Sequence, residues 1–204
     1  MANRVKGFDE HILRCAKEEF LDKGYEDASL RTISKNANVS TSTIYTRYHD
    51  KEGLFRALVE PAAIELLNYL KDSLHGFEAL EPEAQKNERM DYTLKGYDGF
   101  LDVLYRYFDE FQLMTTSSTN GLYRYYLDQL VDVDVACTVH FLKTTKNPAF
   151  LEGRINEEFI HVISSAFYTG VFEIPVHHMK REDAKKYLEQ LSCFYNQGWS
   201  LYLK

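Results

Sequence analysis

The sequence predicts an all-α protein with two parts. Apolar residues recur at three- and four-residue spacing over long stretches, which places them on one face of a helix. The 204 residues include only four prolines and ten glycines, and short segments rich in helix terminators separate the periodic stretches. We therefore expect a three-helix part in residues 1–50 and a larger helical part in residues 51–204, joined by a helix that begins near Lys51.

The first three predicted helices are separated by residues that favour helix ends and turns. The first spans residues 8–23 and is expected to end at Gly24. Ser29 is a good N-cap for the second, Asn38 tolerates the left-handed backbone of a tight turn, and Ser40 is a good N-cap for the third.

Longer helices are expected in the second part. Asp50 caps a fourth helix, in which apolar residues recur every four positions and Pro61 disturbs the bonding. The polar segment at residues 76–89 contains Pro82 and is interpreted as a loop. The remaining helices are expected at residues 92–113, 122–146, 154–172 and 181–203.

The charge of the chain is concentrated in its second part. The formal net charge is −7, but residues 1–60 hold ten basic and ten acidic residues. Phosphate neutralisation supplies most of the non-specific affinity for DNA, so a neutral first part must bind DNA through the local placement of its cations.

Cysteine usage and hydropathy predict a reduced, cytoplasmic protein. Cys15, Cys137 and Cys193 lie far apart and form no CxxC pair, which is typical of ordinary thiols. We find no signal peptide and no uninterrupted apolar run of the ~18 residues that a membrane-spanning helix needs. The chain is therefore expected to have no membrane partner.

The second and third predicted helices have the layout of a helix-turn-helix. Ile44 and Tyr48 lie one turn apart and must face inward, which turns small hydroxyl side chains outward between a tyrosine and an arginine. The outward set is Ser42, Thr43, Tyr45, Thr46 and Arg47. Such a face suits insertion into the major groove, although serine and threonine also cap and solvate ordinary surface helices.

Residues 20–55, FLDKGYEDASLRTISKNANVSTSTIYTRYHDKEGLF, carry the motifs F-x-x-K-G-Y, I-[AS]-x-x-A-x-V-S and [IL]-Y-x-x-[FY]-x-x-K-[EG]-x-L-[FL]. This segment resembles the N-terminal signature of the TetR family of bacterial transcriptional regulators. The resemblance implies an N-terminal helix-turn-helix DNA-binding domain followed by a helical ligand-binding and dimerisation domain.

The resemblance also implies roles for individual residues. Arg31 falls where the family often contacts a base or a phosphate, Tyr45 matches a phosphate-binding tyrosine, and Lys51 matches a lysine that contacts the DNA backbone. The residues predicted to bind DNA are Arg31, Thr41, Ser42, Thr43, Tyr45, Thr46, Arg47 and Lys51. Two positions depart from the family pattern, because Asn38 replaces the usual turn glycine and Tyr48 the more common phenylalanine.

The helices at residues 154–172 and 181–203 carry more apolar positions than one buried face requires. They resemble the family's dimer interface, a four-helix bundle, although a broadly buried helix of a monomer has a similar pattern. The residues predicted to form a homodimer interface are Phe159, Ala166, Gly170, Leu191, Tyr195, Gly198 and Tyr202.

Aromatic residues are dense between residues 92 and 172, where the family places a ligand pocket. Most must be core, but an apolar pocket with a few polar groups is typical of a small-molecule site. The candidates are Phe100, Leu104, Phe108, Phe111, Tyr126, His140, Phe141, His161 and Phe167. We expect a small apolar or aromatic effector, because Arg106 and Arg124 are the only arginines in helices 92–113 and 122–146.

No cofactor or metal is expected, since His177, His178 and Met179 have no second ligand pair nearby in the sequence. No GxSxG, HExxH, P-loop or dinucleotide-binding motif is present, so we do not expect an enzyme. The leading hypothesis is a homodimeric repressor that binds an inverted repeat in double-stranded operator DNA and is released by its effector. The alternatives are an activator, a constitutive DNA-binding regulator, and a helical protein-interaction module.

Overall fold

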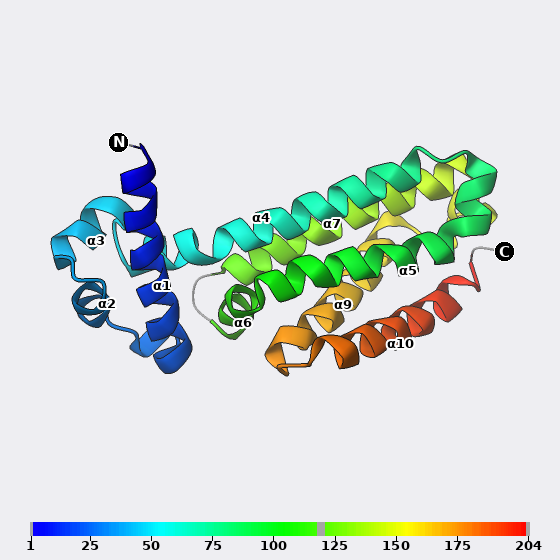
Figure 1. Cartoon of the computed structure of the whole chain (residues 1–204). Coiled ribbons are helices and arrows are strands. Elements are labelled where there is room, and N and C mark those ends of the chain that lie inside the picture. Colours follow the sequence, from blue (N-terminus) through cyan, green and yellow to red (C-terminus); the bar gives the residue numbers. More distant parts are fainter. Residues whose placement is uncertain (1, 118–120, 203–204) are drawn as a thin grey trace. The chain divides into compact units, whose positions relative to one another are not determined.

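The computed structural model describes residues 2–117 and 121–202, and this part of the chain forms ten helices and no strand (Figure 1). The prediction of an all-α protein is confirmed. The helices are α1 (Ala2–Asp27), α2 (Leu30–Asn36), α3 (Thr41–Tyr48), α4 (Lys51–Glu78), α5 (Pro82–Arg106), α6 (Phe108–Thr116), α7 (Leu122–Thr144), α8 (Pro148–Leu151), α9 (Glu157–Val176) and α10 (Arg181–Trp199).

The chain divides into two compact units. The first comprises Met1–Ile64 with Tyr107–Tyr123, and the second comprises Glu65–Arg106 with Arg124–Lys204. Helix α6 therefore belongs to the same unit as the three N-terminal helices, although it follows α5 in the sequence. The functional boundary expected between residues 50 and 51 remains a prediction.

Turn residues in the first unit adopt the conformations that the sequence predicts. Gly24 interrupts α1 with φ 73°, in the left-handed region that favours glycine. Asn38 has φ 53°, and Ser40 Oγ accepts a hydrogen bond of 3.2 Å from the backbone N–H of Thr43. Ser29 precedes α2 as expected, but its side chain makes no capping bond.

The core of the first unit unites its helices. Phe20, Ile33, Ile44 and Phe55 are fully buried and come from α1, α2, α3 and α4. Lys17 on α1 adds ion pairs to α6, with its Nζ 3.2 Å from Glu110 and 3.3 Å from Asp109. Burial of the four apolar side chains is the larger contribution, at roughly 2 kcal/mol each.

The interpretation of residues 76–89 as a loop is wrong. Helix α4 continues to Glu78 and α5 begins at Pro82, so only three residues separate them. Pro82 occupies the first turn of α5, where its missing N–H costs no hydrogen bond. Gln85 then closes the junction, because its Nε2 donates to the carbonyls of Glu78 (3.1 Å) and Leu80 (2.8 Å).

The single helix expected at residues 92–113 is also wrong. Tyr107 has φ −120° and ψ 36°, which is not helical, and it separates α5 from α6. Two segments interpreted as connections contain helix instead, since Asn147 caps the short α8 and α9 continues through Pro175. Helix α10 ends at Trp199, and the expected end at residue 203 lies outside the described residues.

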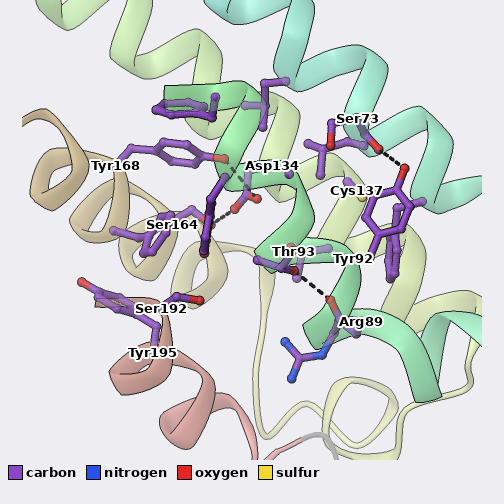
Figure 2. Close-up of a pocket in the computed structure, with 18 of the residues that line it drawn as sticks. Ser73, Arg89, Tyr92, Thr93, Asp134, Cys137, Ser164, Tyr168, Ser192 and Tyr195 are labelled. Atoms are coloured by element: carbon purple, nitrogen blue, oxygen red, sulfur yellow. Dashed lines mark hydrogen bonds between the residues drawn. The ribbon is translucent and has the colours of Figure 1, made fainter. Parts of the chain in front are cut away.

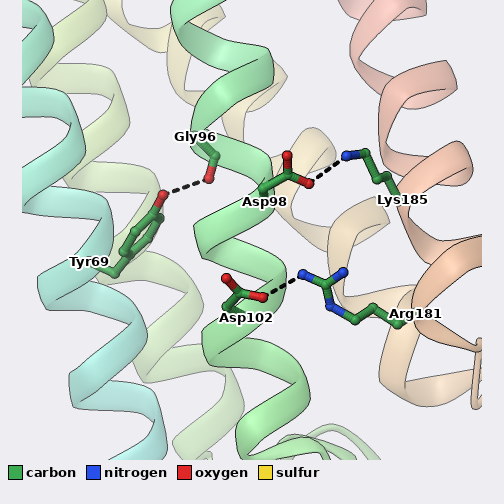
Figure 3. Close-up of polar contacts among 6 residues, drawn as sticks. All are labelled: Tyr69, Gly96, Asp98, Asp102, Arg181 and Lys185. Carbon is green, nitrogen blue, oxygen red and sulfur yellow. Dashed lines mark hydrogen bonds and ion pairs between the residues drawn. The ribbon is translucent and has the colours of Figure 1, made fainter.

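Polar contacts hold α5 against α4 and α10 in the second unit (Figure 3). The Tyr69 hydroxyl donates a 2.7 Å hydrogen bond to the carbonyl of Gly96. On the other side of α5, Asp98 accepts from Lys185 at 2.7 Å and Asp102 pairs with Arg181. Exposed ion pairs contribute little stability, so their main effect is to fix the position of α10.

Helix α9 is more apolar than we expected of any segment. Judged by length and composition, it is the one described helix that could span a membrane, with a mean hydropathy of 1.3. Its side chains Ile160, Tyr168, Val171 and Phe172 are buried within the second unit. A core helix of a soluble protein has the same composition, so the helix is weak support for a membrane protein.

Candidate nucleic-acid interface and internal cavity

The exposed face of α3 has the orientation that its sequence predicts. Ile44 is fully buried, while Ser42, Thr46 and Arg47 are exposed and Tyr45 keeps 52% of its surface accessible. The Ser40 hydroxyl lies 2.7 Å from Ser42 Oγ and 2.8 Å from Thr43 Oγ1, at the beginning of the helix. These hydroxyls are therefore oriented by one another before any ligand arrives.

An open groove brings four of the eight predicted DNA-binding residues together. Arg31, Thr41, Tyr45 and Lys51 line it, along with Ala28, Ser29 and Leu30. Thr41 is the first residue of α3 and Lys51 is the first residue of α4. Two helix N-termini, whose free N–H groups favour anions, thus meet beside two basic residues and a phenol. This combination suits a phosphate backbone.

Lys51 also has a structural role that the sequence did not reveal. Its Nζ donates to the carbonyls of Glu26 (2.7 Å) and Ala28 (3.3 Å) and lies 4.9 Å from the ring centre of Tyr25. The ammonium group therefore satisfies the carbonyls that follow Gly24 while it lines the groove. One of its three N–H donors remains for a further acceptor.

Arg47 is held by α1. Its guanidinium pairs with Asp9 and lies 5.0 Å from the ring centre of Phe8. The Tyr48 hydroxyl donates to the same carboxylate at 3.4 Å, and burial together with Asp9 raises the pKa of Tyr48 to about 12. Arg47 is thus engaged by α1, and Tyr48 is half-buried with its hydroxyl on the same carboxylate.

The second unit contains a partly open cavity of about 210 Å³ (Figure 2). Its walls come from α4, α5, α7, α9 and α10. Of the nine predicted ligand residues, Phe100, Phe141 and Phe167 line it. The other six do not: Leu104, Phe108, Phe111, Tyr126, His140 and His161.

Helical spacing shows which side of a helix faces inward, but not whether a buried ring contacts core or cavity. Leu104 and Tyr126 are buried elsewhere, and His140 is exposed. Phe108 and Phe111 belong to α6 in the first unit, because the helix is interrupted at Tyr107.

A buried carboxyl group faces the cavity from α7. Asp134 accepts hydrogen bonds from Ser164 (2.6 Å) and Tyr168 (3.5 Å), as Figure 2 shows. Burial raises the pKa of Asp134, and the bond from Ser164 lowers it in part. The sequence contained a signal for this residue, because Asp134 continues the apolar positions Leu127, Leu130 and Val131 along α7.

Asp134→Asn is expected to be more stable than the natural protein at high pH. A carboxyl whose pKa is raised by folding binds its proton more tightly in the folded state, so the free energy of unfolding falls as pH increases above the unfolded value of 3.8. The variant should show a higher Tm than the natural protein at pH 8 and a flatter dependence of Tm on pH. Asp132→Asn, on the exposed side of α7, is the control. A Tm lowered at every pH would contradict the expectation.

Helix α9, helix α10 and the turn that follows α10 expose apolar side chains at helical spacing. Val162, Phe194 and Leu201 keep 62%, 76% and 67% of their surface accessible. Ala166 and Gly198 are also exposed, and nothing lies within 4 Å of a Cβ built on Gly198. We call these five residues the α9/α10 face.

Other residues predicted at a dimer interface have partners within the chain. A Cβ on Gly170 would lie 3.2 Å from Leu191 Cδ2, so these two residues pack α9 against α10. The rings of Phe159 and Tyr202 are 5.8 Å apart, and Tyr195 lines the cavity. Phe194, which the list of interface residues omitted, is the most exposed large apolar residue described.

The helix-turn-helix whose third helix exposes hydroxyl side chains has the layout of a DNA-binding domain. Residues 12–58 match the family of bacterial regulatory proteins of the tetR type. The N-terminal domain is thus a tetR-type domain, and the predicted resemblance to the TetR family is confirmed.

Similar proteins agree with this assignment. The uncharacterized HTH-type transcriptional regulator YvdT of Bacillus subtilis is 33% identical over 78 residues, a match that covers 38% of this chain and 40% of that protein. A candidate TetR-family regulator of Mesorhizobium loti has a TM-score of 0.61 at 15% identity, over 98% of this chain and 99% of that one. A transcriptional regulator of Aquifex aeolicus has a TM-score of 0.60 at 19% identity, over 92% and 99%. At these identities the two structures show a shared fold.

Proposed function

We propose that the protein is a cytoplasmic, homodimeric transcriptional repressor. It binds an inverted repeat in operator DNA and dissociates from it when a small molecule enters the cavity. The observation that carries this proposal is the groove of Arg31, Thr41, Tyr45 and Lys51 beside the exposed hydroxyl face of α3. The first group contacts phosphates and the second contacts base edges. No catalytic step is part of the proposed function.

A dimer gives the binding its geometry. The α9/α10 face supplies an apolar surface that a second copy can cover, and a two-fold dimer selects an inverted repeat. The two recognition helices then enter successive major grooves, ~34 Å or a multiple apart.

The cavity supplies the site for an effector. Its apolar walls and few polar groups are those of a small-molecule pocket. Repression relieved by a ligand needs a coupling of ~1–3 kcal/mol between effector and operator affinity. An activator would use the same surfaces with the opposite sign of coupling between effector and operator affinity. A constitutive DNA-binding protein would use the DNA-binding surface with no such coupling. A protein-interaction module would not need the cations and hydroxyls of the groove.

Lys51→Ala is expected to weaken DNA binding about equally for all sequences and to reduce the salt slope by about 1, because Lys51 contacts a phosphate. Arg47→Ala or Thr43→Ala should instead change which bases are preferred. The measurement is selection of bound DNA from a random pool, followed by anisotropy titrations at several salt concentrations.

Lys51 also binds the carbonyls of Glu26 and Ala28, so thermal unfolding of the variant must be measured alongside. Lys23→Ala, at an exposed lysine paired with Asp22, is the control and should bind as the natural protein does. A changed base preference in Lys51→Ala with an unchanged salt slope would show that the roles are assigned wrongly.

A further inference from the structure

The cavity contains a cation that its protein surroundings leave partly unsatisfied. Arg89 lines the wall from α5, and its Nη1 donates a 2.7 Å hydrogen bond to Asn196 Oδ1. Within the described residues, this amide oxygen is the one hydrogen-bond partner of the guanidinium, which has five N–H donors, and no carboxylate pairs with it. Figure 2 shows the side chain extending from α5 toward the helix that carries Ser192 and Tyr195.

Neighbouring groups hold this guanidinium without neutralising it. Asn196 is itself fixed, since its Nδ2 donates to the carbonyl (3.0 Å) and the hydroxyl (3.1 Å) of Ser192. Burial lowers the pKa of Arg89, but an arginine starts near 12.5 and remains charged at physiological pH. A partly buried charge without an opposite charge is costly, and an anion that enters the cavity lowers that cost.

The second charged group of the cavity lies in a separate cluster and does not serve as that anion. Asp134 bonds to Ser164 and Tyr168, and within the described residues it forms no ion pair with Arg89. Tyr97 adds no negative charge either, because burial raises its pKa to about 12. Arg89 therefore dominates the electrostatics of the cavity.

Two phenol groups in the wall already have partners. The Tyr69 hydroxyl donates to the carbonyl of Gly96, and the Tyr92 hydroxyl donates to the carbonyl of Ser73 at 2.9 Å. Much of the remaining wall is apolar, including Phe100, Phe141 and Phe167. The 210 Å³ of space is several times the ~30 Å³ that one water molecule takes up in the liquid. The geometry suits a molecule with one anionic end and an apolar body.

We propose, on the basis that this cavity holds the effector as proposed above, that the effector is an organic acid whose carboxylate binds Arg89 and whose body packs against the aromatic walls. The sequence led us to expect a small apolar or aromatic effector, because Arg106 and Arg124 are the only arginines in the helices predicted at residues 92–113 and 122–146. Those two pair with Glu65 and Asp128 and do not line the cavity. Arg89 was missed because its segment was interpreted as a loop.

The test compares acids with amides of the same skeleton. Trp199 is the single tryptophan of the chain and lines the cavity, so its fluorescence reports occupancy without DNA. Full-length protein is titrated with octanoate, decanoate and 4-phenylbutanoate and with their primary amides. At least one acid should bind ~10-fold or more tightly than its amide, since a hydrogen bond to a charged group contributes about 1.5–3 kcal/mol.

Variants assign the difference to one residue. Arg89→Met should bring the ratio of the two dissociation constants close to one, while Arg89→Lys should keep part of it. Arg124→Met, at an exposed arginine, should behave as the natural protein does, and circular dichroism checks that each variant is folded. Equal binding of acids and amides, no response of Trp199 to any probe at millimolar concentration, or an acid preference that survives Arg89→Met would overturn the proposal.

DNA release is measured in a separate experiment. This separates the test of the organic-acid site from the test of the proposed effector role. Acids that bind through Arg89 and leave operator binding unchanged would support the organic-acid site and contradict the effector role. Acids that release DNA equally from Arg89→Met and from the natural protein would contradict the organic-acid site.

Discussion

Gly53→Ala is expected to destabilise the first unit strongly and to weaken DNA binding. A Cβ on Gly53 would lie 1.9 Å from the backbone oxygen of Tyr48, far inside van der Waals contact. Neither side can yield easily, because the Asp50 N–H donates to the same oxygen at 2.9 Å and the Gly53 N–H donates to Asp50 Oδ1 at 2.7 Å. The turn between α3 and α4 must open, at a cost of about 3 kcal/mol or more.

This cost is a large fraction of the ~5–15 kcal/mol that stabilises a typical domain. Thermal unfolding followed by circular dichroism should show a separate early transition, while Trp199 fluorescence reports a second unit that remains folded. Gly7→Ala is the matched control, because nothing lies within 4 Å of its Cβ and alanine favours a helix interior by up to ~1 kcal/mol. If Gly53→Ala had the same Tm and DNA affinity as the natural protein, the turn would have room for a Cβ at residue 53, which would contradict this prediction.

The parts of the fold that the sequence predicted well depend on local chemistry. Asn38 and Ser40 determine a turn and a cap through their own backbone and side chain, so short motifs identified them correctly. The exposed face of α3 was predicted from Ile44 and Tyr48, because helix geometry places the other residues once the inward-facing positions are known.

The parts that failed depend on contacts between distant residues. Gln85 closes the α4–α5 junction with a side-chain bond that composition does not reveal, and the segment therefore looked like a loop. That error also concealed Arg89, the basic residue of the cavity. Periodicity likewise marked Leu191 and Gly170 as apolar positions but could not show that they pack against each other rather than against a partner.

Loss of the dimer is the other large effect that we expect, and Gly198→Leu should cause it. Within the described residues nothing lies within 4 Å of a Cβ built on Gly198, so the first carbon of a leucine side chain fits there, and leucine should raise helix propensity by up to ~1 kcal/mol. In a dimer built on the α9/α10 face, the same side chain would enter the contact between the two subunits. Phe194→Asp tests the same face by placing a charge where 76% of an aromatic side chain is accessible.

Sedimentation velocity should therefore show a dimer for the natural protein and monomers for both variants, with Tm near or above that of the natural chain for Gly198→Leu. Affinity for an inverted repeat should fall ~100-fold or more, because the second half-site is no longer bound by a linked domain. Tyr125→Asp is the control, since this aromatic residue is 56% accessible but lies on α7. If Gly198→Leu and Phe194→Asp both remain dimeric and bind the repeat normally, the dimer is not built on the α9/α10 face and the partner subunit covers a different surface.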